Sequence, residues 1–158
     1  LEGDEEVTAW VALTPATIEN GCMRFVAGSH NEIVEHVDTH TAENLLTRGQ
    51  EVTVEVDDSN GTDVVLAPGE FSLHHGRVFH ASHPNGSDDR RIGLAIRYIP
   101  TSMRQIAGGN MAAMLVRGED RFHHFRECHR PSGVFLPNDL EHWRDIQGAR
   151  DKVMYRPT

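Results

Sequence analysis

Two side chains near the middle of the chain, His80 and Arg91, have the types and the spacing to build a metal site for an anionic ligand. Between them lies Asn85-Gly86, the dipeptide most typical of a two-residue type I′ hairpin turn. With that turn, His80 faces Arg91 across two antiparallel strands, with Cβ atoms about 5 Å apart. An imidazole binds transition metals, and a guanidinium binds a carboxylate through two hydrogen bonds.

The residues after this turn alternate in character, as a strand with two different faces does. One face is apolar, and the other carries small or cationic side chains, namely Arg91, Gly93, Ala95 and Arg97. Small residues beside a histidine and an arginine leave a cavity, which suits 2-oxoglutarate bound at iron. The alternative is a hydrogen-bonded structural histidine and a surface arginine, which is common for an arbitrary pair of this kind.

Three segments that follow one another along the chain favour the first interpretation. They are VTAWVAL (7–13), ENGCMRFVAGSH (19–30) and HASHPNGSDDRR (80–91), the last running on to Tyr98. Together they resemble the phytanoyl-CoA dioxygenase (PhyH) family of iron(II)/2-oxoglutarate oxygenases over about residues 5 to 100. The family's pattern runs from a tryptophan-bearing strand through NGxxxxxxGSH to a distal histidine, an Asn-containing turn and an arginine.

The resemblance implies a role for four residues. His80 matches the distal metal-binding histidine, and Arg91 matches the arginine that binds the C5 carboxylate of 2-oxoglutarate, so both are expected to be catalytic. Ser82 matches a hydroxyl that helps to hold the same carboxylate, and Trp10 matches a tryptophan that lines the cosubstrate pocket. Otherwise Trp10 would be a core residue and Ser82 a turn residue bonded to the backbone. The expected cofactors are iron(II), 2-oxoglutarate as cosubstrate, and O2.

A facial triad needs two further ligands, which in the family form a His-x-Asp pair before the tryptophan strand. The sequence starts at Leu1 without such a pair, so we expect an N-terminally incomplete chain that is inactive alone. His36-Val37-Asp38 has the His-x-Asp form but follows the GSH motif, in a polar stretch that indicates a loop. We therefore favour a place for it in a lid over the pocket rather than at the metal.

The resemblance implies a dioxygenase that hydroxylates an unactivated C–H bond of a small molecule. One alternative is a halogenase of the same family, in which a small residue replaces the metal carboxylate and chloride binds iron. The residue two positions after the upstream histidine would separate the two. Another alternative is a non-catalytic jelly-roll module that binds a metabolite without iron.

Turn residues separate short β-type runs along most of the chain. They predict a mainly β fold, a double-stranded β-helix (jelly roll, cupin-like) with a C-terminal helix. Residues 1–100 form the C-terminal part of the jelly-roll core, and residues 101–158 form an extension in the same domain, with a helix at 138–154 capped by Pro137-Asn138-Asp139. The strands are expected at 7–13, 22–27, 51–56, 63–66, 70–75, 78–82 and 91–99.

The composition of the chain limits the classes of partner that it is expected to bind. The net charge of −9 argues against nucleic-acid binding, and no apolar run is long enough to span a bilayer. Cys22 and Cys128 form no CxxC pair, which indicates reduced thiols and a cytoplasmic location. The partner is therefore a small-molecule substrate, and a homo-oligomer remains open.

Two histidine-rich stretches carry further hypotheses. Four zinc-capable residues, His123, His124, Cys128 and His129, form one cluster rather than two separated pairs, so a surface or subunit contact is favoured over zinc. His74 and His75 precede the metal strand. Alternation along a strand predicts that one of them enters the pocket while the other points away.

Overall fold

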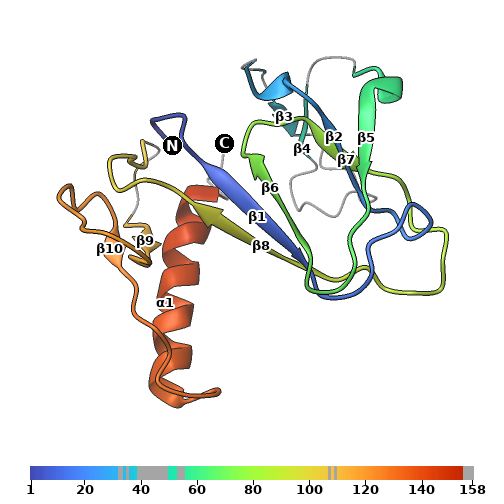
Figure 1. The fold of residues 1–158 in the computed structure, drawn as a ribbon. Helices are drawn as coiled ribbons and strands as arrows, with labels where there is room; N and C mark the ends of the chain where they lie inside the picture. Colours follow the sequence, from blue (N-terminus) through green and yellow to red (C-terminus); the bar gives the residue numbers. More distant parts are fainter. Residues whose placement is uncertain are drawn as a thin grey trace. The chain divides into compact units, whose positions relative to one another are not determined.

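The structure is a computed structural model, and it describes residues 1–31, 34, 36–38, 50–52, 56–106, 108 and 110–154. The chain forms two compact units (Figure 1). One unit is Val7–Tyr98, and the other combines Leu1–Glu6 with the chain from Ile99 onward. The predicted division at residue 100, with both parts in one domain, stays a prediction.

Two three-stranded antiparallel sheets form the unit Val7–Tyr98 (Figure 1). The first sheet has the order β6-β1-β8, with β1 at Val7–Ala12, β6 at Phe71–His75 and β8 at Gly93–Tyr98. The second has the order β5-β2-β7, with β2 at Met23–Val26, β5 at Gly61–Val64 and β7 at His80–Ser82. Each of these strands falls within a predicted run or extends it by at most two residues, which confirms the mainly β prediction.

The predicted hairpin between residues 80 and 91 is wrong, because β7 and β8 belong to different sheets. His80 pairs with Phe25 on β2, whereas β8 pairs with β1. Neither Asn85 nor Gly86 has the positive φ that a type I′ turn requires. Instead, Asn85 forms a turn through its side chain: its Oδ1 accepts from the Ser87 N–H at 2.8 Å, and its Nδ2 donates to the Asp89 carbonyl at 2.7 Å.

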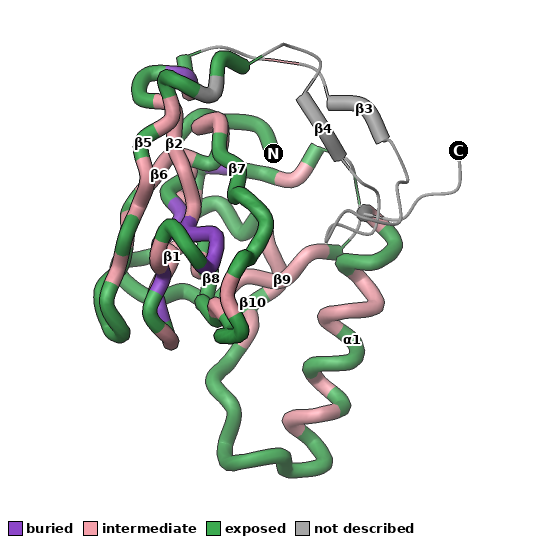
Figure 2. The backbone as a smooth tube through the Cα atoms, turned by 90° about the vertical axis from the view of Figure 1, so that its right-hand side faces the viewer, coloured by how far each residue is buried: buried purple, intermediate pink, exposed green. Residues whose placement is uncertain are grey.

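The most buried apolar residues of this unit are small, and they concentrate on β1 and the turn that follows it (Figure 2). Ala12 and Ala16 are fully buried, and Cys22 is 2% exposed. Burial raises the pKa of the Cys22 thiol, and both cysteines are free. The side chains between the sheets are larger: the ring of His74, on the first sheet, lies 4.6 Å from that of Phe25 on the second.

The segment 36–38, expected to be a loop, is a strand. It forms β3 (His36–Asp38), which pairs antiparallel with β4 (Gln50–Val52) in a sheet of their own. The polar composition of this stretch concealed it, because strand signals rely on alternating apolar residues. The part of the predicted strand 51–56 that covers 53–55 lies outside the described residues.

The second unit contains the helix α1 (Pro137–Met154) and a two-residue parallel pair, β9 (Ala112–Ala113) with β10 (Arg126–Glu127). The predicted helix is confirmed, and it begins at Pro137 because proline suits the first helical position. Asp139 does not cap the helix: its carboxylate accepts from the backbone N–H groups of Ser132 and Gly133 and fixes the preceding loop. Within the described residues, no helix combines the length and apolar character that crossing a membrane requires.

Candidate active site

One ring nitrogen of His80 is held by a backbone carbonyl, and the other is not. Its Nδ1 lies 2.8 Å from the Val78 carbonyl. A carbonyl can only accept, so Nδ1 carries the hydrogen and the lone pair of Nε2 is available. Metal-binding histidines characteristically donate their second nitrogen to a carbonyl or carboxylate in this way. The side chain is exposed at the start of β7, which leaves Nε2 accessible.

Ser29 of the GSH motif holds the backbone directly before His80. The Phe79 N–H donates to the Ser29 hydroxyl at 2.8 Å, and that hydroxyl donates to the Val26 carbonyl at 2.8 Å. Ser29 is 8% exposed, so neither bond is easily replaced by water. The hydroxyl therefore joins the end of β2 to the beginning of β7. The motif identified this serine in the sequence, but its structural role was not predicted.

Replacing Ser29 by alanine should leave the Phe79 N–H without its acceptor in a partly buried position. Such a loss costs about 1–3 kcal/mol, so we expect the free energy of unfolding to fall by that amount. Urea-induced unfolding measures it. Ser102→Ala, at an exposed serine, serves as the control and should change stability little. Equal stability of the two variants would contradict the role of Ser29.

Three of the residues implied by the family resemblance meet at the other end of β7. Arg91 Nη2 donates to the Ser82 hydroxyl at 3.3 Å. The guanidinium carbon of Arg91 lies 5.5 Å from the centroid of the Trp10 ring, a distance at which cation and aromatic face attract each other. His80 and Ser82 lie on the same side of β7, because side chains alternate along a strand. The structure thus brings the predicted arginine to the His80 side of β7 from the segment that leads into β8 of the other sheet.

Thr14 fixes the backbone on both sides of Arg91. The Ile92 N–H donates to its hydroxyl at 2.8 Å, and this hydroxyl donates to the Arg90 carbonyl at 2.9 Å. Thr14 is distant in sequence from both partners, and no local pattern indicated the contact. The Thr14 hydroxyl thus fixes the backbone around Arg91, as the Ser29 hydroxyl fixes the backbone before His80.

Gly93 makes room for the indole of Trp10. A Cβ atom at Gly93 would lie 2.0 Å from Trp10 Cζ2, far inside contact distance. Trp10 pairs with Ala95, the next residue on the same face of β8, so small side chains continue along that face. The sequence predicted a cavity along this face, but at Gly93 the Trp10 indole fills the space.

Gly93→Ala should therefore displace Trp10 and, with it, Arg91. Overpacking of this kind costs about 1–3 kcal/mol. Urea unfolding should show this loss, and 2-oxoglutarate should bind more weakly. Gly148→Ala is the matched control: an added Cβ meets nothing within 4 Å in α1, so helix propensity should raise stability by up to ~1 kcal/mol. Unchanged stability of Gly93→Ala would contradict the packing argument.

A pocket of about 510 Å³ lies within the unit Val7–Tyr98. His74 and His75 both line it, and the expectation that one of them points away from the metal site stays a prediction. The His74 ring lies 6.0 Å from that of His80, and its Nδ1 is buried without a hydrogen-bond partner among the described residues. Burial lowers the pKa of His74, and the charges of His80 and Arg97 lower it further.

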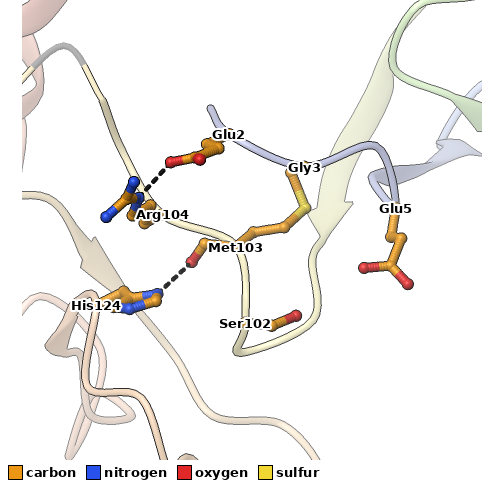
Figure 3. Close-up of a pocket in the computed structure, with 7 residues that line it drawn as sticks. All are labelled: Glu2, Gly3, Glu5, Ser102, Met103, Arg104 and His124. Atoms are coloured by element: carbon orange, nitrogen blue, oxygen red, sulfur yellow. Dashed lines mark hydrogen bonds and ion pairs between the residues drawn. The ribbon is translucent and has the colours of Figure 1, made fainter.

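A second pocket, of about 270 Å³, lies in the other unit (Figure 3). Four of its residues are joined in two pairs: Arg104 pairs with Glu2, and His124 Nδ1 donates to the Met103 carbonyl at 3.1 Å. These contacts hold Leu1–Glu6 against the chain near Met103. Because these groups already bind one another, few polar groups are left to bind a ligand, and we do not place the active site there.

The side chains of the histidine-rich stretch near residue 125 make separate contacts. His129 stacks on His142 at 4.2 Å, and His123 lies beside Asp120, whereas His124 binds Met103. Within the described part of the chain, no group of three or more His, Cys, Asp or Glu residues is placed to hold a metal. The side chains of His36 and Asp38 lie outside the described set, so their role stays a hypothesis.

The fold and the site define a class of protein: an antiparallel two-sheet β protein in which one strand, β7, carries an imidazole and a serine, and an arginine from the segment before β8 binds that serine. Residues 2–93 match the phytanoyl-CoA dioxygenase (PhyH) family, and the chain belongs to that family. The resemblance drawn from the three sequence segments is confirmed. A phytanoyl-CoA dioxygenase domain-containing protein 1 homolog of Caenorhabditis briggsae is 31% identical over 104 residues, which cover 59% of this chain and 34% of that protein.

Solved structures agree with this assignment. The apo form of the non-heme monooxygenase ThoJ is 35% identical, with a TM-score of 0.81 over 94% of this chain and 53% of that one. CytC3 with Fe(II) and alpha-ketoglutarate is 26% identical, with a TM-score of 0.52 over 78% of this chain and 44% of its own. The chain thus spans between a third and about half of these proteins.

Proposed function

We propose that this chain is part of an iron(II)- and 2-oxoglutarate-dependent dioxygenase that hydroxylates an unactivated C–H bond of a small molecule. The observation that carries the proposal is the Arg91–Ser82 pair, which lies two residues along β7 from a histidine with an available Nε2. Membership of the PhyH family supports the proposal. The solved structure of CytC3 with Fe(II) and alpha-ketoglutarate supports it as well.

The described residues fit one part of an iron site. His80 would bind the metal through Nε2, and a facial triad requires two further ligands beyond the residues described here. Iron, when bound, supplies the coupled oxidation in which 2-oxoglutarate, O2 and R–H give succinate, carbon dioxide and R–OH. The protein supplies the geometry of the ligands and the binding of the cosubstrate.

Arg91 and Ser82 would bind the far carboxylate of 2-oxoglutarate. The Ser82 oxygen already accepts from Arg91, so its own hydrogen is available for a carboxylate oxygen. The guanidinium adds a charge-assisted hydrogen bond, and the Trp10 face limits how Arg91 can turn. We place the metal at the His80 end of β7 and the anchored carboxylate at its Ser82 end.

We further propose that the two sheets are part of a jelly roll. Successive strands support this, because the chain changes sheet between β1 and β2 and again at each step from β5 to β8. For the whole protein, we propose an enzyme that acts on a small molecule in the cytoplasm.

The experiment uses the complete gene product under anaerobic conditions. Addition of iron(II) and then 2-oxoglutarate should produce the weak visible charge-transfer band of a keto acid chelated to iron(II). Succinate, which lacks the keto group, should give no band. A non-catalytic binding module would show no band with either acid, and that result would overturn the proposal. With oxygen and chloride present, a hydroxylated product supports the hydroxylase and a chlorinated product the halogenase.

A further inference from the structure

The pocket of about 510 Å³ in the unit Val7–Tyr98 differs in character from the arginine site. Its lining includes Phe25, His30, Val64, His74, His75 and Val78, whereas Trp10, Ser82 and Arg91 do not line it. We propose that this pocket is the subsite for the substrate, and that it takes a small apolar molecule bearing a carboxylate. The inference rests on the proposed function and adds a substrate class to it.

The position of the pocket places its occupant beside the proposed metal ligand. Phe25 and His74 both line it, and their rings lie 6.4 and 6.0 Å from that of His80. A volume of this size accommodates a small molecule of ordinary ligand dimensions. A C–H bond of the occupant could therefore approach the metal while 2-oxoglutarate remains bound at Arg91 and Ser82.

The lining indicates an apolar body. Aliphatic and aromatic residues from β2 and the residue after it, β5, β6 and the β6–β7 turn make up most of it: Phe25, Ala27, Val64, Leu73 and Val78. Burial of apolar ligand surface against such walls contributes roughly 25 cal/mol per Å². A fully polar substrate would lose its hydration here without recovering enough hydrogen bonds.

Three imidazoles supply the polar part of the pocket. His30, on the short 3₁₀ helix η1 (Ser29–Asn31), lies with its ring 5.3 Å from that of His75, and His74 follows along the same wall. The buried Nδ1 of His74 has no partner among the described residues, and a buried polar atom of this kind calls for a ligand group or water.

The charges around these imidazoles favour an anion. None of the described residues that line the pocket is an aspartate or a glutamate. Arg97 lies on the His74 side of the first sheet, because both residues pair with Thr8 on β1. A cationic substrate would find no counter-charge in the lining, whereas a carboxylate can accept hydrogen bonds from imidazole N–H groups.

The test uses three probes with the same six-carbon chain: hexanoate, 1-hexanol and hexylammonium. They are titrated without iron into the complete gene product with 15N-labelled histidine side chains. We expect hexanoate to shift the imidazole signals of His30, His74 and His75, with at least about tenfold tighter binding than hexylammonium, the effect of one charge-assisted hydrogen bond. His30→Asn should weaken hexanoate binding severalfold. His123→Asn, at an exposed histidine of the other unit, should leave it unchanged.

Variants at Arg91 separate the two subsites. Hexanoate binding that persists in Arg91→Gln and weakens in His30→Asn supports the inference. The reverse pattern would show that hexanoate occupies the cosubstrate site, and would overturn it. If the iron band forms with 2-oxoglutarate while no probe shifts the three imidazoles, the inference fails and the proposed function stands. If hexanoate binds the imidazoles but no iron band forms, the proposed function fails, and with it the assignment of the pocket to an oxygenase substrate.

Discussion

His80→Ala is expected to lower the affinity of the complete protein for iron(II) more than about 100-fold, and to lower substrate turnover with it. Mutation of a residue that only hydrogen-bonds to a metal ligand lowers metal affinity or activity by about 10- to 100-fold. Loss of the ligand itself should therefore lower the affinity by more than that. The variant should fold normally, because the His80 side chain is exposed. Anaerobic equilibrium dialysis measures the bound iron.

His123→Ala is the control for that experiment, since His123 is an exposed histidine of the other unit and should not alter iron binding. Urea unfolding of both variants verifies that the comparison is between folded proteins. Iron affinity in His80→Ala equal to that of the unmodified protein would remove His80 from the metal site.

Arg91→Gln is expected to weaken 2-oxoglutarate binding by about 10- to 150-fold. Hydrogen bonds to charged groups contribute about 1.5–3 kcal/mol, and glutamine retains a donor but loses both the charge and the planar fork. Titration of the charge-transfer band with 2-oxoglutarate gives the dissociation constant. Turnover at saturating 2-oxoglutarate should fall less than the affinity does, because Arg91 binds the end of the cosubstrate remote from the keto acid.

The adjacent Arg90 offers a matched control. It contributes its backbone carbonyl to Thr14, and its side chain is exposed, so Arg90→Gln should bind 2-oxoglutarate nearly as well as the unmodified protein. Arg91→Lys should fall between the two, because lysine keeps the charge without the bidentate geometry. Equal losses in Arg90→Gln and Arg91→Gln would indicate a diffuse effect of surface charge rather than a carboxylate anchor.

The sequence predicted the positions of strands better than their partners. Alternation and turn residues located β1, β6 and β8 closely, because these signals are local. The pairing of strands depends on residues far apart in the sequence. The Asn85-Gly86 dipeptide led to a wrong prediction of pairing, because Asn85 forms its turn through a side-chain hydrogen bond. The Gly86 N–H also donates to the Glu19 carbonyl at 2.9 Å, a contact that no short pattern contains.

The candidate site shows the same limit. The resemblance indicated His80, Arg91, Ser82 and Trp10, and the last three meet in the structure as an Arg91-centred group. The hydroxyls of Ser29 and Thr14 were not predicted in their supporting roles, because each bridges backbone groups that only the folded chain brings together. His74 was considered, but its contact with Phe25 depends on how the sheets pack.

His80 lies on β7 of one sheet, whereas the backbone of Arg91 leads into β8 of the other sheet, so the spacing between these two residues depends in part on the gap between the sheets. The Ser29 hydroxyl fixes the backbone beside His80 and the Thr14 hydroxyl fixes the backbone beside Arg91, but neither hydroxyl links the two residues. Substitutions that thicken or thin the interior, such as a change at Ala12 or Phe25, should therefore alter which length of dicarboxylic keto acid fits best. A homologous series with one carbon fewer or more than 2-oxoglutarate would reveal that change in preference without any alteration of the residues that touch the acid.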